Sequence, residues 1–161
     1  MTPKLTIVYR VDGGSRGNPG PAGYGVAIAT PEGDSLGALH ASVGIQTNNY
    51  AEYSGLIAAL RDALERQAER VLVYADSQLL VRQMQGRYAV KSANLRPLYD
   101  EARRLAGSLA SFTIEHVYRE ANRDADRLAN LAMDEAKGNS SPARPRATGG
   151  CDPAKSGEPP R

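Results

Sequence analysis

Apolar and polar residues alternate along the opening part of the chain, which is the pattern of strands with one buried face. This pattern predicts three strands, over Lys4–Val11, Gly23–Thr30 and Ser35–Gly44. Pro31–Asp34 has the composition of a tight turn between the second and third strands. Strands joined by short turns favour an antiparallel meander.

From residue 47 the apolar residues recur at helical spacing instead. A helix is predicted over 49–67, and Thr47 and the two asparagines after it offer the side-chain oxygens that cap a helix start. Three further helices are predicted over Leu79–Met84, Asn94–Ala106 and 121–136.

The continuous apolar run Arg70–Ala75 is typical of a strand buried on both faces, and Phe112–Val117 is predicted as a fifth strand. Strands and helices therefore alternate in the second half of the chain, which predicts an α/β fold. A right-handed β-α-β crossover would place the fourth strand beside the first.

Composition changes sharply near the end of the chain. Residues 138–161 contain five prolines, four glycines and three serines, so we expect a disordered tail or an interdomain linker there. The other 137 residues have the length of one domain with a sizeable core. The domain prediction is therefore 1–137 for the folded unit and 138–161 for the tail.

The net charge of +2 comes from the tail, which holds four of the 20 basic and two of the 18 acidic residues. The predicted folded unit thus has 16 of each and is neutral overall. A local basic stretch between Arg82 and Arg104 is either a nucleic-acid-binding face or a solvated helical face. Its basic members are Arg82, Arg87, Lys91, Arg96, Arg103 and Arg104, against Asp100 and Glu101.

The chain has no apolar run near the ~20 residues that span a membrane, and its start lacks the pattern of a signal peptide. Its single cysteine, Cys151, lies in the tail, which excludes an intramolecular disulfide framework and a cysteine-based zinc site. We therefore expect a cytoplasmic protein without a membrane partner.

Four acidic residues stand at predicted junctions between elements. Asp12 ends the first strand before a glycine-rich loop over 13–20, and Asp76 ends the fourth strand. Glu52 falls in the first turn of the helix over 49–67, and Asp126 opens the last helix. Three of them have an ordinary interpretation: a turn-forming aspartate at Asp12, a helix cap at Asp76, and a carboxylate favoured by the helix dipole at Glu52.

The predicted crossover can also bring all four carboxylates together. Crowded carboxylates repel and raise one another's pKa unless a cation neutralises them. An all-oxygen set suits two Mg²⁺ ions, with Mn²⁺ as a substitute, rather than zinc. Two such ions about 4 Å apart can activate a water and stabilise the leaving oxygen of a phosphodiester.

Short polar side chains surround these junctions and suit a nucleic-acid substrate. Such groups can contact sugars, phosphates and base edges, including a 2′-hydroxyl. The glycine-rich loop lacks the Gly-Lys-Ser/Thr ending of a P-loop. The short polar residues are Ser15, Asn18, Thr47, Asn48 and Gln78.

Four segments resemble ribonuclease H type 1, in the form without a basic protrusion. They occur in the family's order and spacing, and the resemblance covers residues 4 to 136. The segments are Asp12–Gly25, Thr47–Glu52, Tyr74–Gln78 and Arg119–Ala129.

The resemblance implies a five-stranded mixed sheet, order 3-2-1-4-5, with helices on both faces. It also implies endonucleolytic cleavage of the RNA strand of RNA–DNA hybrids, leaving 5′-phosphate and 3′-hydroxyl ends. Asp12 would bridge both metal ions, and Asp126 would help hold the ion that activates water. Glu52 and Asp76 would hold the ion at the leaving oxygen, with Glu52 also near the 2′-hydroxyl.

The resemblance assigns substrate contacts as well. Thr47 would contact a DNA phosphate. The groups that would read the minor groove of the hybrid are Gly13, Gly14, Ser15, Asn18, Asn48 and Gln78.

The sequence departs from the family pattern at two places. Many members carry a mobile histidine before the last helix, where this chain has the short loop 118–121 with Arg119. Arg119 or Glu120 is thus a candidate for product release or substrate contact, and His116 is expected to be structural. The second departure is the missing tryptophan-containing protrusion. Either the grip on the hybrid is weaker without it, or Arg82, Arg87, Lys91 and Arg96 supply that grip.

Asp124 lies close to Asp126. The resemblance implies that Asp126 is the ligand, because Leu128 and Ala129 then match the family's register, and Asp124 is expected to be a helix-start residue. Two other hypotheses stay open: a non-catalytic nucleic-acid-binding domain, and a related exonuclease or junction resolvase. We expect a monomer that binds an RNA–DNA hybrid, and the tail allows for a fused C-terminal domain.

Overall fold

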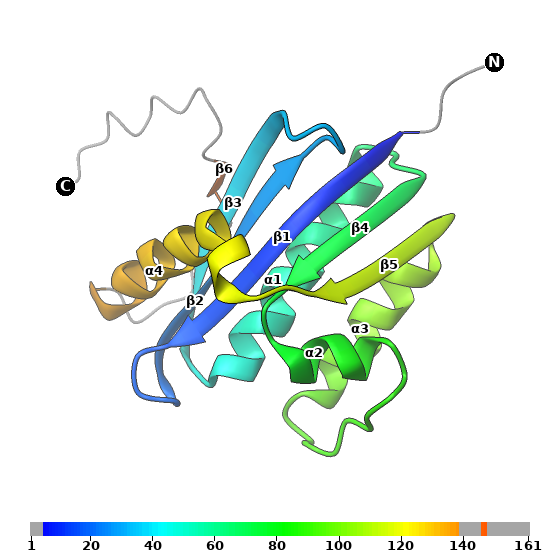
Figure 1. Cartoon of the computed structure of the whole chain (residues 1–161). Coiled ribbons are helices and arrows are strands. Elements are labelled where there is room, and N and C mark those ends of the chain that lie inside the picture. Colours follow the sequence, from blue (N-terminus) through cyan, green and yellow to red (C-terminus); the bar gives the residue numbers. More distant parts are fainter. Residues whose placement is uncertain (1–4, 139–145, 148–161) are drawn as a thin grey trace.

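The computed structural model describes residues 5–138 and 146–147. Its strands form one mixed sheet in the order β5-β4-β1-β2-β3-β6 (Figure 1). β1, β4 and β5 are parallel, and β2, β3 and β6 extend the sheet in antiparallel fashion. The strands are β1 Thr6–Ser15, β2 Gly20–Ala29, β3 Ser35–Gln46, β4 Arg70–Ala75, β5 Ser111–His116 and β6 Arg146–Ala147.

The predicted order 3-2-1-4-5 is confirmed for the first five strands. The sixth, β6, pairs with β3 at Leu39 and His40. Apart from β6 and Gly138, the predicted tail lies outside the described residues, so its assignment as a linker stays a prediction.

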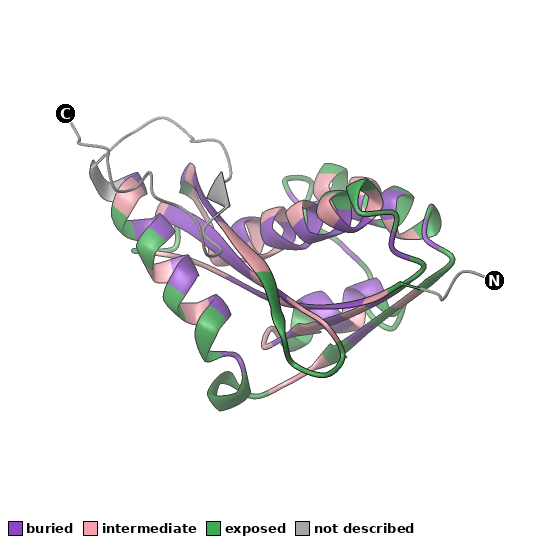
Figure 2. Cartoon of the chain, turned by 90° about the horizontal axis from the view of Figure 1, so that it is seen from above, coloured by how far each residue is buried: buried purple, intermediate pink, exposed green. Residues whose placement is uncertain are grey.

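Helices cover both faces of the sheet, as predicted. α4 lies on one face, and α1, α2 and α3 lie on the other (Figures 1 and 2). A short 3₁₀ turn, η1, precedes α4. The helices are α1 Asn48–Glu65, α2 Gln78–Met84, α3 Arg96–Gly107, η1 Arg119–Ala121 and α4 Arg123–Gly138.

The strand pleat sends neighbouring residues of β2 to opposite layers. Tyr24 points toward α1, while Gly23 and Gly25 leave room for α4. A Cβ at Gly25 would lie 2.5 Å from the Ala125 carbonyl oxygen, so only glycine lets α4 pack this closely on the sheet. This contact sets the position of the start of α4, where Asp126 lies.

The core lies mainly between the sheet and α1. Tyr9, Tyr53, Leu56 and Leu60 are fully buried there, and Figure 2 shows the buried side of each long helix turned toward the sheet. None of the helices in the described ranges is long and apolar enough to cross a membrane.

β1 is longer than predicted, and this changes the setting of Asp12. The strand continues through Gly13, Gly14 and Ser15, because these residues pair with β2 as far as Ser15 opposite Ala22. Glycine is a poor strand former, so the local sequence indicated a loop, and the pairing partner overrides that preference.

Candidate active site

Asp12 lies inside β1 rather than at its exposed end, so the predicted location was wrong in detail. On the other side of β1, however, β4 ends at Ala75 opposite Val11. Asp12 is therefore the first β1 residue beyond the parallel pairing, at the carboxyl edge where α/β sheets place ligand sites. It is 9% exposed, and its Oδ1 accepts a 2.9 Å hydrogen bond from the Gly13 amide.

Glu52 reaches Asp12 because α1 lies directly on β1. A Cβ at Gly13 would lie 2.6 Å from the Glu52 amide nitrogen, so only a glycine permits this approach. α1 begins at Asn48, with the Thr47 hydroxyl accepting from the Tyr50 amide. Glu52 is thus the fifth helical residue, beyond the first turn, and the helix-dipole interpretation of Glu52 is wrong.

Asp76 follows β4 and does not cap α2. The cap is the next residue, Ser77, whose hydroxyl accepts a 3.2 Å hydrogen bond from the Leu80 amide. The carboxylate of Asp76 is therefore left for the cluster.

The structure brings the predicted carboxylates together. Asp12, Glu52 and Asp76 each offer an oxygen within 4.8 Å of the other two. Asp126 stands outside that tightest group but interacts with Asp12. Hydrogen bonding with the carboxyl group of Asp126 raises the pKa of Asp12. Four elements, β1, α1, β4 and α4, thus deliver acidic groups to one point.

The cluster is electrostatically costly without a cation. Burial, then the charge of Asp76, then hydrogen bonding to Asp126 raise the pKa of Asp12 from 3.8 to about 8. Burial also raises the pKa of Glu52 from 4.5 to about 8, although a hydrogen bond from Ser77 opposes this. Crowded, desolvated carboxylates hold protons unless a positive charge replaces them.

The residues present fit a hard divalent cation. The Oδ2 atom of Asp76 is buried and has no hydrogen-bond partner among the described residues. The cluster offers only carboxylate oxygens, without a histidine or cysteine. Oxygen-only sites suit Mg²⁺ or Mn²⁺ rather than zinc.

These pKa values predict how pH affects stability. The unfolded chain releases the protons of Asp12 and Glu52 near pH 4, whereas the folded chain keeps them to about pH 8. Stability from these groups is therefore complete below pH 4 and is lost as pH rises through 8, by an amount on the order of a few kcal/mol. We expect the melting temperature in EDTA to fall from pH 5 to pH 9.

Mg²⁺ should reduce this fall, because the cation favours the ionised carboxylates. Thermal melts with and without Mg²⁺ measure the effect. The matched variant, Asp12→Asn, should show a flatter dependence in EDTA. An unchanged slope in that variant would contradict the assignment of the effect to the cluster.

A second group of predicted residues forms a polar network beside the cluster. The side chain of Asn48 accepts a 2.8 Å hydrogen bond from the Ser15 amide, and the side chain of Asn18 accepts from the Asn48 amide at 2.9 Å. The Ser15 hydroxyl in turn accepts from the Asn18 amide. The network thus orients three side chains from β1, its loop and α1.

Two backbone amides of this region donate to side chains of the site. The Gly13 amide donates to Asp12, and the Ser15 amide donates to Asn48. These two amides therefore organise the site, and the proposed contacts of Gly13 and Ser15 with a substrate would use other atoms of these residues. Gln78 lies apart from the network, exposed at the start of α2.

Comparisons with known proteins agree with this geometry. A family model described as reverse transcriptase-like matches residues 10–132. A bifunctional protein of Mycobacterium tuberculosis, Rv2228c, is 47% identical over 133 residues, which are 82% of this chain and 36% of that protein. The crystal structure of ribonuclease H1 from Halobacterium salinarum is 37% identical, has a TM-score of 0.77, and matches over 81% of this chain and 98% of its own. The chain belongs to the ribonuclease H family.

Two more solved ribonuclease H structures share the fold. The N-terminal ribonuclease H domain of the mycobacterial protein has a TM-score of 0.82 at 45% identity, covering 86% of this chain and all of that domain. LC11 ribonuclease H1, isolated from compost, was solved with an RNA/DNA hybrid. It has a TM-score of 0.76 at 41% identity, covering 81% of this chain and 99% of its own. The chain spans about a third of the length of the mycobacterial relatives that it matches.

Asn122 is a site residue that the sequence reasoning missed. Its side chain is fully buried and donates a 3.0 Å hydrogen bond to the Val11 carbonyl, 111 residues away. The backbone carbonyl of Asn122 accepts a hydrogen bond from the backbone amide of Asp126. In this ribonuclease H-family chain, Asn122 therefore ties the start of α4 to β1 beside Asp12. The only sequence signal was its place inside the segment Arg119–Ala129.

Arg119 lies in η1 with an exposed side chain that makes no hydrogen bond or ion pair with the described residues. Its role in product release stays a prediction. His116 ends β5, half-buried, with its ring edge-on to Tyr118 at 5.1 Å.

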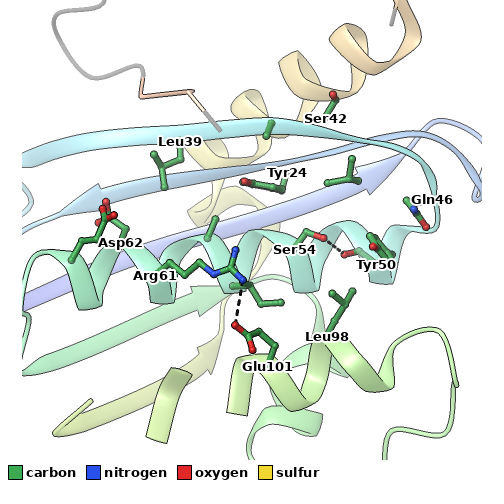
Figure 3. A pocket seen from close by; sticks show the side chains of 15 residues that line it. Tyr24, Leu39, Ser42, Gln46, Tyr50, Ser54, Arg61, Asp62, Leu98 and Glu101 are labelled. Atoms are coloured by element: carbon green, nitrogen blue, oxygen red, sulfur yellow. Dashed lines mark hydrogen bonds and ion pairs between the residues drawn. The ribbon is translucent and has the colours of Figure 1, made fainter. Parts of the chain in front are cut away.

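A cavity of about 670 Å³ lies away from the carboxylates, between β3, α1 and α3 (Figure 3). Tyr24, Leu39 and Leu98 line it, and Arg61 forms an ion pair with Glu101 at its edge. None of the four acidic residues borders it, so the cluster and this cavity are separate features.

Proposed function

We propose that this chain is an endonuclease that hydrolyses the RNA strand of RNA–DNA hybrids with two divalent ions. The products would carry 5′-phosphate and 3′-hydroxyl ends. The observation that carries the proposal is the acidic cluster of Asp12, Glu52, Asp76 and Asp126 in a ribonuclease H-family chain. A protein that only bound polyanions would gain nothing from crowded carboxylates.

Each acidic residue has a proposed role. Asp12, which interacts with both Asp76 and Asp126, would contact both ions. Asp126 would help hold the first ion, and Glu52 and Asp76 would hold the second, with Glu52 near the 2′-hydroxyl of the substrate. Two Mg²⁺ ions, or Mn²⁺ as a substitute, would supply activation of a water and stabilisation of the leaving oxygen.

The proposed substrate contacts surround this cluster. Ser15, Asn18 and Asn48 form one hydrogen-bonded network, so their positions are fixed before a substrate arrives. The proposed minor-groove contacts also include Gly13, Gly14 and Gln78. Thr47 would contact a phosphate of the DNA strand. The complex of the LC11 relative with an RNA/DNA hybrid supports this choice of substrate.

The proposal also covers the setting of the domain. Residues 1–137 would be the catalytic domain, and 138–161 would link it to a further C-terminal domain. The bifunctional name and greater length of the mycobacterial relative support this division. We also propose that the enzyme is a cytoplasmic monomer. Light scattering after size-exclusion chromatography tests its oligomeric state.

Cleavage assays on labelled duplexes test the activity. We expect Mg²⁺-dependent internal cuts in the RNA strand of a hybrid and none in duplex DNA, because the 2′-hydroxyl is part of the recognition. Blocked 3′ and 5′ ends should not reduce cleavage. A requirement for a free end, or for a branched junction, would favour the exonuclease or resolvase hypothesis instead.

A further inference from the structure

A second polar pocket lies on the same edge of the sheet as the acidic cluster. Its volume is about 240 Å³. His116 of β5 is paired in register with Ala75 of β4, the residue before Asp76. Gln78 follows Asp76 by two residues and also lines the pocket. The full lining is Gln78, Val81, Arg82, Gln85, Arg87, Glu115 and His116.

Two arginines give this pocket a positive balance. Arg82 and Arg87 line it against a single acidic residue, Glu115. Neither arginine forms an ion pair within the described ranges. Their charges are therefore free to act on a ligand.

Three other arginines of the basic stretch are engaged elsewhere. Arg96 pairs with Asp100 and Arg104 with Glu101, both on the surface of α3. Arg103 donates to the Met84 carbonyl at 2.9 Å. Arg96 and Arg104 therefore fit the solvated-face interpretation, whereas Arg82 and Arg87 line the pocket.

The side chains in the pocket are held by neighbours. Arg82 donates a 3.0 Å hydrogen bond to the Tyr88 hydroxyl and lies 5.4 Å from the centre of its ring. The side-chain amide nitrogen of Gln85 donates a hydrogen bond to the Ile114 backbone carbonyl. The side-chain oxygen of Gln85 accepts a hydrogen bond from Arg87 at 3.4 Å. A fixed guanidinium loses less entropy when it binds an anion.

We propose that this pocket is an accessory subsite that binds a backbone phosphate of the nucleic acid whose scissile phosphate lies at the acidic cluster. This inference rests on the proposed function. Arg82 and Arg87 neutralise the phosphate, and His116 adds a hydrogen bond to its oxygens. Gln78, the proposed minor-groove contact, reaches the sugar that adjoins this phosphate. The cluster by itself repels a polyanion, so a nearby cationic subsite supplies attraction and sets the register of the strand.

The first test measures binding of a labelled RNA–DNA hybrid in the Asp12→Asn background, over a series of salt concentrations. Arg87→Gln removes a charge with only one weak contact, so the fold should be retained. We expect roughly fivefold weaker binding and a slope of log K against log salt that is smaller by about 1. Glu115→Gln should act in the opposite direction and strengthen binding.

The matched control is Arg104→Gln, which changes net charge equally but lies on α3, outside the pocket. It should leave affinity and slope close to those of the parent. Equal effects of Arg87→Gln and Arg104→Gln would overturn the subsite, because net charge alone would then explain the loss.

The second test finds which strand supplies the phosphate. Single phosphates are replaced by neutral methylphosphonates along the RNA strand in one series and along the DNA strand in another. We expect one position, in one strand, at which the replacement weakens binding to the parent but not to Arg87→Gln. If neither strand shows such a position, the subsite is wrong.

These outcomes are separable from failure of the proposed function. If the hybrid binds but wild-type chain does not cut it in Mg²⁺, the catalytic proposal fails. The response to Arg87→Gln would still decide whether the pocket contacts a phosphate.

Discussion

Asp12→Asn is expected to abolish Mg²⁺-dependent cleavage of a labelled RNA–DNA hybrid, with a loss of roughly 10³-fold or more. Asp12 is buried, offers an oxygen within 4.8 Å of oxygens of Glu52 and Asp76, and interacts with Asp126. An amide keeps the shape of the side chain but cannot provide the negative charge with which Asp12 would hold the proposed divalent ions. Initial cleavage rates at saturating hybrid measure the loss.

The same variant should fold normally. The charge removed is one that its neighbours oppose, since burial, Asp76 and Asp126 all raise the pKa of Asp12. In EDTA at pH 8 the variant should therefore be as stable as the parent or more stable. A loss of activity together with an intact melting transition separates a catalytic role from a structural one.

Asp124→Asn is the matched control. Asp124 stands two residues before Asp126 in the first turn of α4, and its side chain is exposed. The control has the same change in charge and chemistry as Asp12→Asn, but cleavage should stay within a factor of a few. Full activity in Asp12→Asn, or inactivation by Asp124→Asn, would remove the present assignment of the cluster.

The regular elements were predictable where the local pattern and the tertiary structure agree. β4 was predicted over its observed residues, Arg70–Ala75, because a short apolar run between polar residues has few alternatives. β1 was predicted too short, because Gly13 and Gly14 disfavour strands until β2 pairs with them. Pairing partners are a tertiary property that a local window does not contain.

The candidate site shows the same division. The four carboxylates could be predicted because each lies within a few residues of one end of a strand or helix, and the topology brings these ends together. Which of two adjacent residues takes a given role could not be predicted. Asp76 and Ser77 are both good helix caps, and only the structure shows that Ser77 takes that role. The bond from Asn122 to Val11 depends on packing between distant segments, so no local spacing indicated it.

Gly13→Ala is expected to impair both stability and cleavage. A Cβ at this position would lie 2.6 Å from the Ala51 carbonyl carbon and from the Glu52 amide nitrogen. Both atoms are helix backbone, so α1 must move away from β1 at a cost of about 1–3 kcal/mol. That movement carries Glu52 away from Asp12 and Asp76, and a misplaced carboxylate should lower kcat more than it raises KM.

Urea denaturation and steady-state cleavage of the hybrid, at a temperature well below the melting transition, measure the two effects. Gly107→Ala is the matched control, because no atom lies within 4 Å of a Cβ added there. It should leave both properties almost unchanged.

The resemblance to ribonuclease H assigned Gly13 to substrate reading, and that role makes a different prediction: normal stability with a raised KM. Because the structure places Gly13 against the backbone of α1, we expect the midpoint of unfolding to fall in Gly13→Ala, and an unchanged midpoint would contradict the packing role.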